Sequence, residues 1–430
     1  MLSYEDFLSA SPTSYHAVEQ IVSVLDAAGF REQDETEAWQ GLSRGYVVRD
    51  GSVIAWIRGA DDTLGFKVVG THTDSPTFQL KPNPDGRAFG FSQVNVEVYG
   101  GMLPNSWFNR DLGIAGCLVT LGGDVHLVKT GPIMVIPQLA IHLDRSQMES
   151  VSMSRQRDLH PIWATGDRSI FEYVCGEAGV DPETVASMDL FAYDTQGPAR
   201  VGEFIASGRQ DNLSSTWAGI KAFIEADSAL ADATADDATQ ASDEGGHGVV
   251  VERGETLVFA SFDHEEVGSS SYNGAAGPFL EAILRRLGAA IEPGEEAFQQ
   301  MLANSTCVSA DAGHSINPNR PEKHDPDHHP VLGGGPMLKI NANQRYATEA
   351  VGAAMWLRAC HAADVPAQEF VSNNDIPCGS TIGPITATRL GITTVDVGAG
   401  LLSMHSAREL CGVEDPWLLA RAMRAYWAGA

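Results

Sequence analysis

The sequence predicts an α/β protein with an inserted β-rich domain, and three observations support this prediction. Strand-like apolar runs alternate with amphipathic helical segments in residues 1–79 and again in residues 207–430. Such alternation is typical of layered structures in which helices cover a sheet. Residues 80–206 differ, because their strand-like runs are separated by Gly-Pro and Gly-Asp turns. The length of 430 residues also exceeds what one compact core usually fills. We therefore expect a discontinuous domain, 1–79 with 207–430, interrupted by the insertion 80–206.

The first part of the chain predicts one helix followed by three strands. The helix begins after Pro12-Thr13-Ser14 and ends near Gly29, with apolar residues spaced to form one face: Ala17, Val18, Ile21, Val22 and Leu25. The strands are expected at 46–48, 53–57 and 66–70.

The second part begins with another helix, which Asp211 or Asn212 could cap. Its apolar face would be formed by Leu213, Trp217, Ile220, Phe223 and Ile224. Residues 226–248 are rich in Ala, Asp, Thr and Gly, and we expect them to form a surface loop. A strand at 256–262, a helix at 279–287 and a strand at 306–310 follow.

Composition excludes several classes of protein. The net charge of −28 argues against nucleic acid and anionic membranes as partners. No apolar run reaches the length of a membrane span, and the N-terminus has no signal-peptide pattern. The six cysteines are scattered without a C-x-x-C pair, which predicts reduced thiols in a cytoplasmic protein.

Five metal-competent positions carry the chemistry. Four strand-like segments end in such a residue, and a helix start adds the fifth: His72, Glu265-Glu266, Asp311, His405 and Asp211. Ligands of α/β sheets gather at the carboxyl ends of strands. Two histidines and three carboxylates suit zinc, but they are too many for one catalytic ion with an open position. They suit two zinc ions that share a bridging carboxylate, with the second glutamate free to act as general base.

Six segments, in this order along the chain, resemble the aspartyl aminopeptidase family of di-zinc metallopeptidases. They are Thr71-His72-Thr73-Asp74-Ser75-Pro76, Ser207-Gly208-Arg209-Gln210-Asp211-Asn212, Asp263-His264-Glu265-Glu266-Val267-Gly268-Ser269, Asp311-Ala312-Gly313-His314, Asn343-Gln344-Arg345-Tyr346-Ala347-Thr348 and Ser403-Met404-His405-Ser406. The resemblance implies a three-layer α/β/α catalytic domain whose insertion is a dimerisation domain.

The resemblance also assigns the ligands of two zinc ions per subunit. Asp211 resembles the bridging ligand, His72 and Asp311 the ligands of one zinc. Glu266 and His405 resemble the ligands of the other. Manganese and cobalt are alternatives, because the same ligands accept several divalent ions.

Five further residues receive roles, four of them through the resemblance alone. Glu265 resembles the general base. Asp74 lies two residues after His72, where its carboxylate could accept the ring N–H of that histidine, and it matches the family partner of this ligand. Lys339 matches a lysine that meets an acidic substrate side chain, and Gly379 belongs to a loop lining the cleft. His142 matches a histidine that reaches a neighbouring subunit's active site.

The implied function is removal of N-terminal Asp or Glu from peptides, through a zinc-bridging water that Glu265 deprotonates. A cytoplasmic dodecamer built from dimers is the implied assembly. Three alternatives stay open at this point: a di-zinc aminopeptidase of neutral or broad specificity, an N-acyl amino acid deacylase, and a catalytically idle scaffold. The His-rich segment 324–330 contains prolines that prevent a helical ligand face, so we interpret it as a loop near the cleft.

Overall fold

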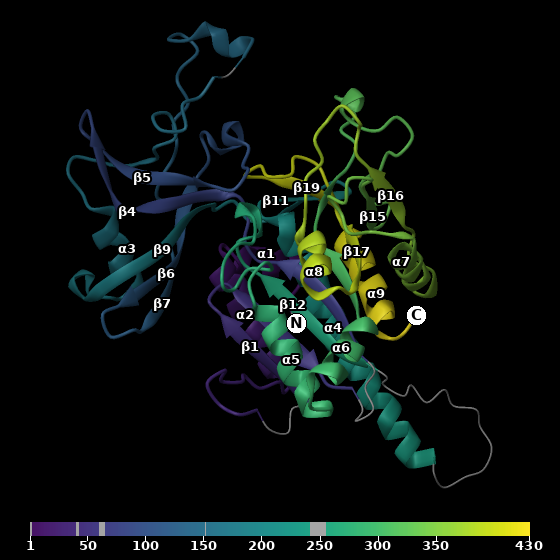
Figure 1. The fold of residues 1–430 in the computed structure, drawn as a ribbon. Coiled ribbons are helices and arrows are strands. Elements are labelled where there is room, and N and C mark those ends of the chain that lie inside the picture. Colours follow the sequence, from purple (N-terminus) through teal and green to yellow (C-terminus); the bar gives the residue numbers. More distant parts are fainter. Residues whose placement is uncertain (1, 40–42, 60–64, 151, 241–254) are drawn as a thin grey trace.

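Two large sheets occupy separate parts of the molecule (Figure 1). The computed structural model describes residues 2–39, 43–59, 65–150, 152–240 and 255–430. One sheet has eight strands and the other has six. The predicted combination of an α/β part and a β-rich part is therefore confirmed.

The eight-stranded sheet combines strands from before and after the β-rich part. Its order is β1 (Arg44–Arg49), β2 (Ser52–Ile57), β12 (Glu255–Phe262), β3 (Gly65–His72), β13 (Thr306–Ala310), β17 (Thr393–Gly398), β15 (Met337–Ile340) and β16 (Gln368–Val371). Strands β12, β3, β13 and β17 are parallel to one another. Their carboxyl ends therefore meet at one edge of the sheet, where Phe262 lies opposite His72.

Helices cover both faces of this sheet. Alternate strand residues point to opposite faces, so Val69 and Phe259 belong to one core, and Val68 and Val258 to the other. The first face is covered by α1 (Tyr4–Ala10), α2 (Ser14–Ala27), α4 (Gln210–Gln240), α7 (Ala350–Ala362) and α9 (Asp415–Trp427). The second is covered by α5 (Phe279–Ile291), α6 (Glu295–Ala303) and α8 (Ile382–Leu390). This is the three-layer arrangement that the sequence predicts.

The six-stranded sheet is antiparallel and has a separate core. Its order is β7 (Val125–Lys129), β6 (Leu112–Thr120), β9 (Val185–Asp194), β4 (Thr77–Ala88), β5 (Phe91–Tyr99) and β8 (Ile162–Thr165). Helix α3 (Ile170–Ala178) packs on it. The boundaries at 79 and 207, and the role of this part in dimerisation, stay predictions.

Smaller elements complete the chain. Strands β10 (Ala199–Val201), β11 (Phe204–Ser207) and β19 (Glu409–Gly412) form a three-stranded sheet, and β14 (Gly313–His314) pairs with β18 (Gly400–Leu401). The 3-10 helices of the described residues are η1 (Pro104–Trp107), η2 (Arg145–Met148), η3 (Pro182–Thr184), η4 (Glu265–Val267) and η5 (Pro321–Lys323).

The prediction of a loop at 226–248 is wrong for the first part of this segment. Helix α4 continues to Gln240, and it extends away from the body of the molecule in Figure 1. Alanine has the highest helix propensity, so the alanines of this stretch favour a helix. Residues 241–248 lie outside the described part of the chain.

Two features bear on the predicted surroundings of the protein. No helix within the described ranges is long and apolar enough to cross a membrane. All six cysteines are free, as the sequence predicts, and only Cys378 is not fully buried.

Candidate metal centre

The five predicted metal-competent positions converge at the carboxyl edge of the parallel strands. His72 is the last residue of β3, and Asp311 directly follows β13. Glu266 lies in η4, just after β12. Asp211 precedes the regular part of α4, because its backbone angles and those of Asn212 are not helical. His405 lies in the loop between β18 and β19.

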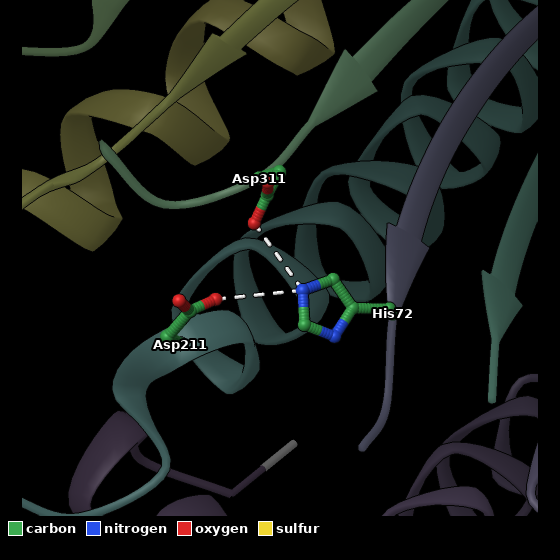
Figure 2. Close-up of side chains that lie close together, drawn as sticks. All are labelled: His72, Asp211 and Asp311. Atoms are coloured by element: carbon green, nitrogen blue, oxygen red, sulfur yellow. Dashed lines mark hydrogen bonds and ion pairs between the residues drawn. The ribbon is translucent and has the colours of Figure 1, made fainter. Parts of the chain in front are cut away.

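Three side chains form one group, shown in Figure 2. The Nε2 atom of His72 lies 3.2 Å from Oδ1 of Asp311 and 3.4 Å from Oδ1 of Asp211. A tetrahedral ion with bonds of 2.0–2.1 Å holds its ligand atoms about 3.3 Å apart. These separations therefore suit a shared zinc ion.

A second group forms on the other side of Asp211 and contains Glu266 and His405. The Nε2 atom of His405 lies 3.2 Å from Oδ2 of Asp211 and 3.6 Å from Oε2 of Glu266. Asp211 thus belongs to both groups, and its two oxygens face different histidines.

The histidine rings present the same nitrogen to the carboxylates. Nδ1 of His72 lies 3.1 Å from the backbone oxygen of Asp74, and Nδ1 of His405 lies 3.1 Å from that of Gly101. A carbonyl oxygen only accepts, so the ring proton is on Nδ1 in both residues. Nε2 of each ring faces the carboxylates, and with a metal bound its lone pair would be directed at the ion, which is the tautomer that a metal requires.

Burial and neighbouring carboxylates disfavour the charged forms of both glutamates of the cluster, an effect that a bound cation would offset. Burial, together with Asp311, Asp74 and Asp211, raises the pKa of Glu265 to about 8 against the influence of His72. Burial and Asp211 raise the pKa of Glu266 well above its usual range.

Two carboxylate oxygens of the cluster also have no hydrogen-bond donor. Among the described residues, Oε1 of Glu266 and Oδ1 of Asp211 are buried without a hydrogen-bond partner. A buried carboxylate oxygen is costly in this state unless an ion binds it. The donor set, its spacing and these two oxygens therefore fit zinc.

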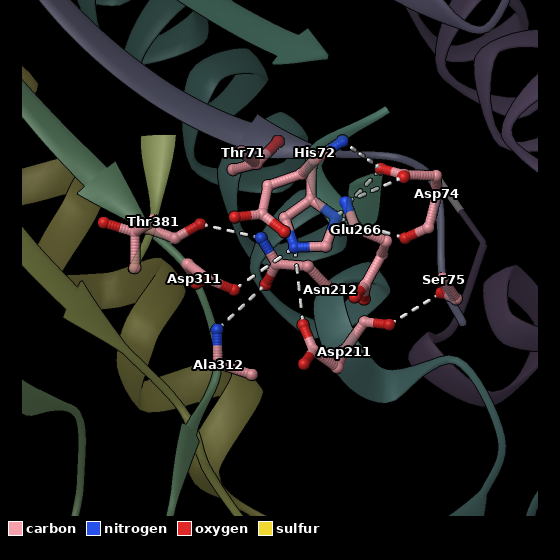
Figure 3. A network of polar contacts seen from close by, with 12 residues as sticks. Thr71, His72, Asp74, Ser75, Asp211, Asn212, Glu266, Asp311, Ala312 and Thr381 are labelled. Carbon is pink, nitrogen blue, oxygen red and sulfur yellow. Dashed lines mark hydrogen bonds and ion pairs between the residues drawn. The ribbon is translucent and has the colours of Figure 1, made fainter. Parts of the chain in front are cut away.

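Asp74 contacts more of the site than its predicted partner His72. Its oxygens accept the backbone N–H groups of Glu265 and Glu266, each at 3.1 Å. They also accept the hydroxyl of Tyr99 at 2.8 Å and lie 3.3 Å from Nδ1 of His72. Figure 3 shows Asp74 beside His72 and Glu266. This buried carboxylate fixes the turn that carries both glutamates.

Sequence reasoning missed three residues that hold the site: Tyr99, Asn212 and Glu409. The Asn212 side chain donates to the backbone oxygen of Ala310 at 2.8 Å and accepts the N–H of Ala312 at 3.2 Å (Figure 3). Its amide thus fixes the backbone on both sides of Asp311, a role different from the helix capping suggested for it. The contacts of Tyr99 and Asn212, and the contact of Glu409 with Asp211, join residues far apart in the chain, so no local pattern indicates them.

Lys339, His142 and Gly379 lie in different surroundings. The Lys339 side chain is 1% exposed, and its Nζ donates to the backbone oxygen of Ala312 at 2.8 Å and lies 3.5 Å from Oδ2 of Asp311. Gly379 is exposed, and its carbonyl accepts a hydrogen bond from Arg345. His142 is exposed on a turn of the β-rich part, outside the metal groups of the described chain.

Comparison with known proteins decides the family. The model of a family described as "Aminopeptidase I zinc metalloprotease (M18)" matches residues 7–427. The chain belongs to the M18 family of zinc aminopeptidases. This confirms the resemblance stated from the sequence, and the chain is an aminopeptidase of that family.

Curated relatives of this M18 chain match it along its length. "Probable M18 family aminopeptidase 2" of Streptomyces avermitilis is 46% identical over 435 residues, covering 98% of this chain and 96% of the relative. The protein of the same name from Pseudomonas aeruginosa (strain UCBPP-PA14) is 42% identical over 446 residues, covering 99% and 97%.

Solved M18-like structures share the fold. The structure titled "Cryo-EM structure of the Ape4 and Nbr1 complex" has a TM-score of 0.88 at 33% identity, covering 99% of this chain and 84% of that one. A yeast structure described as an mApe1 dodecamer has a TM-score of 0.82 at 27% identity, covering 99% and 96%.

Proposed function

We propose that this M18 aminopeptidase binds two zinc ions that share Asp211 and removes Asp or Glu from the N-termini of peptides. The observation that carries the proposal is that Asp211 groups with His72 and Asp311 through one oxygen and faces His405, beside Glu266, with the other. One carboxylate facing two sets of ligands is the arrangement of a two-metal site. Manganese and cobalt are the alternatives that the same donors accept.

Glu265 is the proposed general base. Its carboxylate lies within 4.8 Å of ligand atoms of His72 and Glu266, and the hydrogen bond from its N–H to Asp74 fixes its backbone. Bound zinc would polarise the scissile carbonyl and lower the pKa of the attacking water. Glu265 would accept a proton from that water and return it to the leaving amine.

Lys339 is the proposed determinant of acidic specificity. Its ammonium is buried at the edge of the metal centre, where a charge acts more strongly than in water. Ala312 and Asp311 occupy two of its three donor directions. The third could receive a substrate carboxylate.

The same contacts favour a second candidate, an aminopeptidase of neutral or broad specificity. If the ammonium of Lys339 serves only to orient Asp311, it contributes nothing to the choice of substrate. The two functions differ in the preference among N-terminal residues, and they share the hydrolytic chemistry.

Self-association is proposed from the relatives. A yeast relative is described as a dodecamer, and His142 is exposed in the β-rich part, where a second subunit could meet it. The insertion 80–206 would then serve as the dimerisation domain, with His142 reaching the neighbouring active site and Gly379 lining the cleft.

The test uses metal-stripped protein restored with zinc, and peptides that begin with Asp, Glu, Ala, Leu or Lys, with N-acetyl-Asp peptide as control. We expect zinc-dependent release of Asp and Glu, and no reaction of the acetylated peptide, which has no free α-amine. Preference for Leu or Ala would favour the second candidate. Removal of the acetyl group would place the protein among the deacylases and contradict both.

A further inference from the structure

We propose that Glu409 is a positioning residue that sets the affinity of the metal centre by holding the backbones of two ligands, Asp211 and His405. The inference rests on the proposed sharing of Asp211 between two ions. Nothing in the predicted ligand set includes Glu409, which belongs to none of the metal-competent groups of the described residues.

The contacts use both oxygens of the carboxylate. Oε2 of Glu409 accepts the backbone N–H of Asp211 at 3.1 Å, and Oε1 accepts that of His405 at 2.8 Å. The side chain is 1% exposed. One carboxylate therefore links the start of α4 to the loop before β19.

Strand pairing brings these segments together. In the antiparallel pair β11–β19, Glu409 lies opposite Ser207, four residues before Asp211. Glu409 also follows His405 by four residues. The backbone oxygen of Glu409 accepts a hydrogen bond from the side-chain amide of Gln210 at 2.9 Å. This contact also links β19 to the residue before Asp211.

The backbone at these ligands needs such support. His405 has φ 65°, and Arg209, two residues before Asp211, has φ 63°. Left-handed conformations are unfavourable for residues other than glycine and persist only where the surroundings fix them. Within the described chain no cation forms an ion pair with Glu409. The two N–H groups are therefore the partners that satisfy its side chain.

An amide cannot replace this carboxylate. Glutamine has one acceptor oxygen, and its NH2 group would meet the second N–H as a donor facing a donor. One ligand backbone would then lose its partner while the side chain kept its size. Residues that orient metal ligands typically change metal affinity 10- to 100-fold when replaced.

The experiment measures Co²⁺ binding to the metal-free protein by titration, and zinc retention against a chelator. We expect Glu409→Gln to weaken one of the two ions about 10- to 100-fold. If this variant does not fold, Glu409→Asp keeps the charge but is too short to reach both N–H groups, and the same loss is expected.

Asp415→Asn is the matched control. The Asp415 side chain is also 1% exposed and accepts two backbone N–H groups, from Gly333 at 2.9 Å and Gly412 at 3.1 Å, without touching a metal ligand. Both N–H groups bind the same oxygen, Oδ2, so the single oxygen of asparagine can keep both, and we expect this buried amide substitution to leave Co²⁺ affinity unchanged. Affinity of Glu409→Gln within twofold of wild type, or an equal loss in Asp415→Asn, would overturn the inference. Binding of one ion by the wild-type protein would instead overturn the proposed two-metal site.

Discussion

The two sheets bury charge in different ways. Among the described residues of the six-stranded sheet, Asp194 is the only buried carboxylate, and it forms an ion pair with Arg110. Around the carboxyl edge of the eight-stranded sheet, the buried carboxylates include Asp74, Asp211, Asp263, Asp311 and Glu409. Within the described chain, Lys339 is the only lysine or arginine that forms an ion pair with one of these five. Since unpaired buried charge is costly, the excess at one edge indicates a site built for a cation.

The sheets are nevertheless joined at the metal centre. Tyr99 ends β5 of the six-stranded sheet and donates to Asp74, and Gly101 accepts from the ring of His405. The β-rich part thus contributes no residue to the metal-competent groups of the described chain, but it contacts His405, which belongs to one of these groups, and Asp74, which lies beside them. Four predictions test this division, beginning with the largest expected effect.

Glu265→Gln tests the chemistry of the eight-stranded sheet. The amide keeps the shape of the side chain but cannot accept the proton of the attacking water, so we expect kcat to fall roughly 10²- to 10⁴-fold with zinc content unchanged. The measurement is steady-state hydrolysis together with metal analysis. Glu97→Gln, at an exposed position of β5, is the control and should leave both values unchanged. A kcat within threefold of wild type for Glu265→Gln would contradict its role as base.

Lys339→Met tests specificity at the same edge. Hydrogen bonds to charged groups contribute about 1.5–3 kcal/mol, so we expect kcat/KM for N-terminal Asp to fall roughly 10- to 100-fold relative to Leu. The ratio between the two substrates separates recognition from any effect that reaches catalysis through Asp311. Lys323→Met, on exposed η5, is the control. An unchanged ratio would favour broad specificity.

Tyr99→Phe tests the contribution of the six-stranded sheet. Loss of the hydroxyl removes one of the donors to Asp74, and we expect kcat to fall roughly tenfold while the fold is retained. The control is Tyr193→Phe, which removes a hydroxyl that donates to the backbone oxygen of Thr130 in the same part of the molecule. Equal effects of the two variants on kcat would show that the contact with Asp74 has no special importance.

The contact between the two parts at His16 can be tested through the pH dependence of the free energy of unfolding. Burial, with Lys129 and Arg209 nearby, lowers the pKa of His16 to about 4 in the folded protein from its ordinary value of 6.5. Between these pH values the unfolded chain binds more protons, so the free energy of unfolding falls as the pH falls, by about 3 kcal/mol at most.

Denaturant unfolding of the metal-free protein from pH 7 to 4 measures this effect. His16→Gln should flatten the dependence on pH, whereas His361→Gln, at an exposed position of α7, should not. Parallel pH profiles for wild type and His16→Gln would contradict the assignment.

Much of the site is predictable from sequence, because its ligands follow apolar strands whose parallel arrangement brings their ends together. His72, Asp311 and the Glu265-Glu266 pair are of this kind. Tyr99, Asn212 and Glu409 are not, since each of them contacts a residue 25 to 198 positions away. Two of them act through backbone N–H groups, and the contact of Glu409 with His405, four positions away, adds no recognisable motif. For Glu409 the sequence offers one signal, a carboxylate next to the apolar residues Leu410 and Cys411, because glutamate is rarely buried without a partner.

The fold shows the same limit. Periodicity predicted the helices that bury an apolar face, such as α2 and α5. It missed the distal part of α4, whose alanines favour a helix without a periodic apolar pattern. The pairing order of the eight-stranded sheet, which joins β12 to β3 across almost 200 residues, has no local signal at all.

The most direct test of the central claim is a crystal structure of the zinc-loaded protein with anomalous scattering recorded at the zinc edge. We expect two peaks about 3.5–4 Å apart, with Asp211 between them. One peak should lie beside His72 and Asp311, and the other beside Glu266 and His405. A single peak, or peaks at the His-rich segment 324–330, would contradict it.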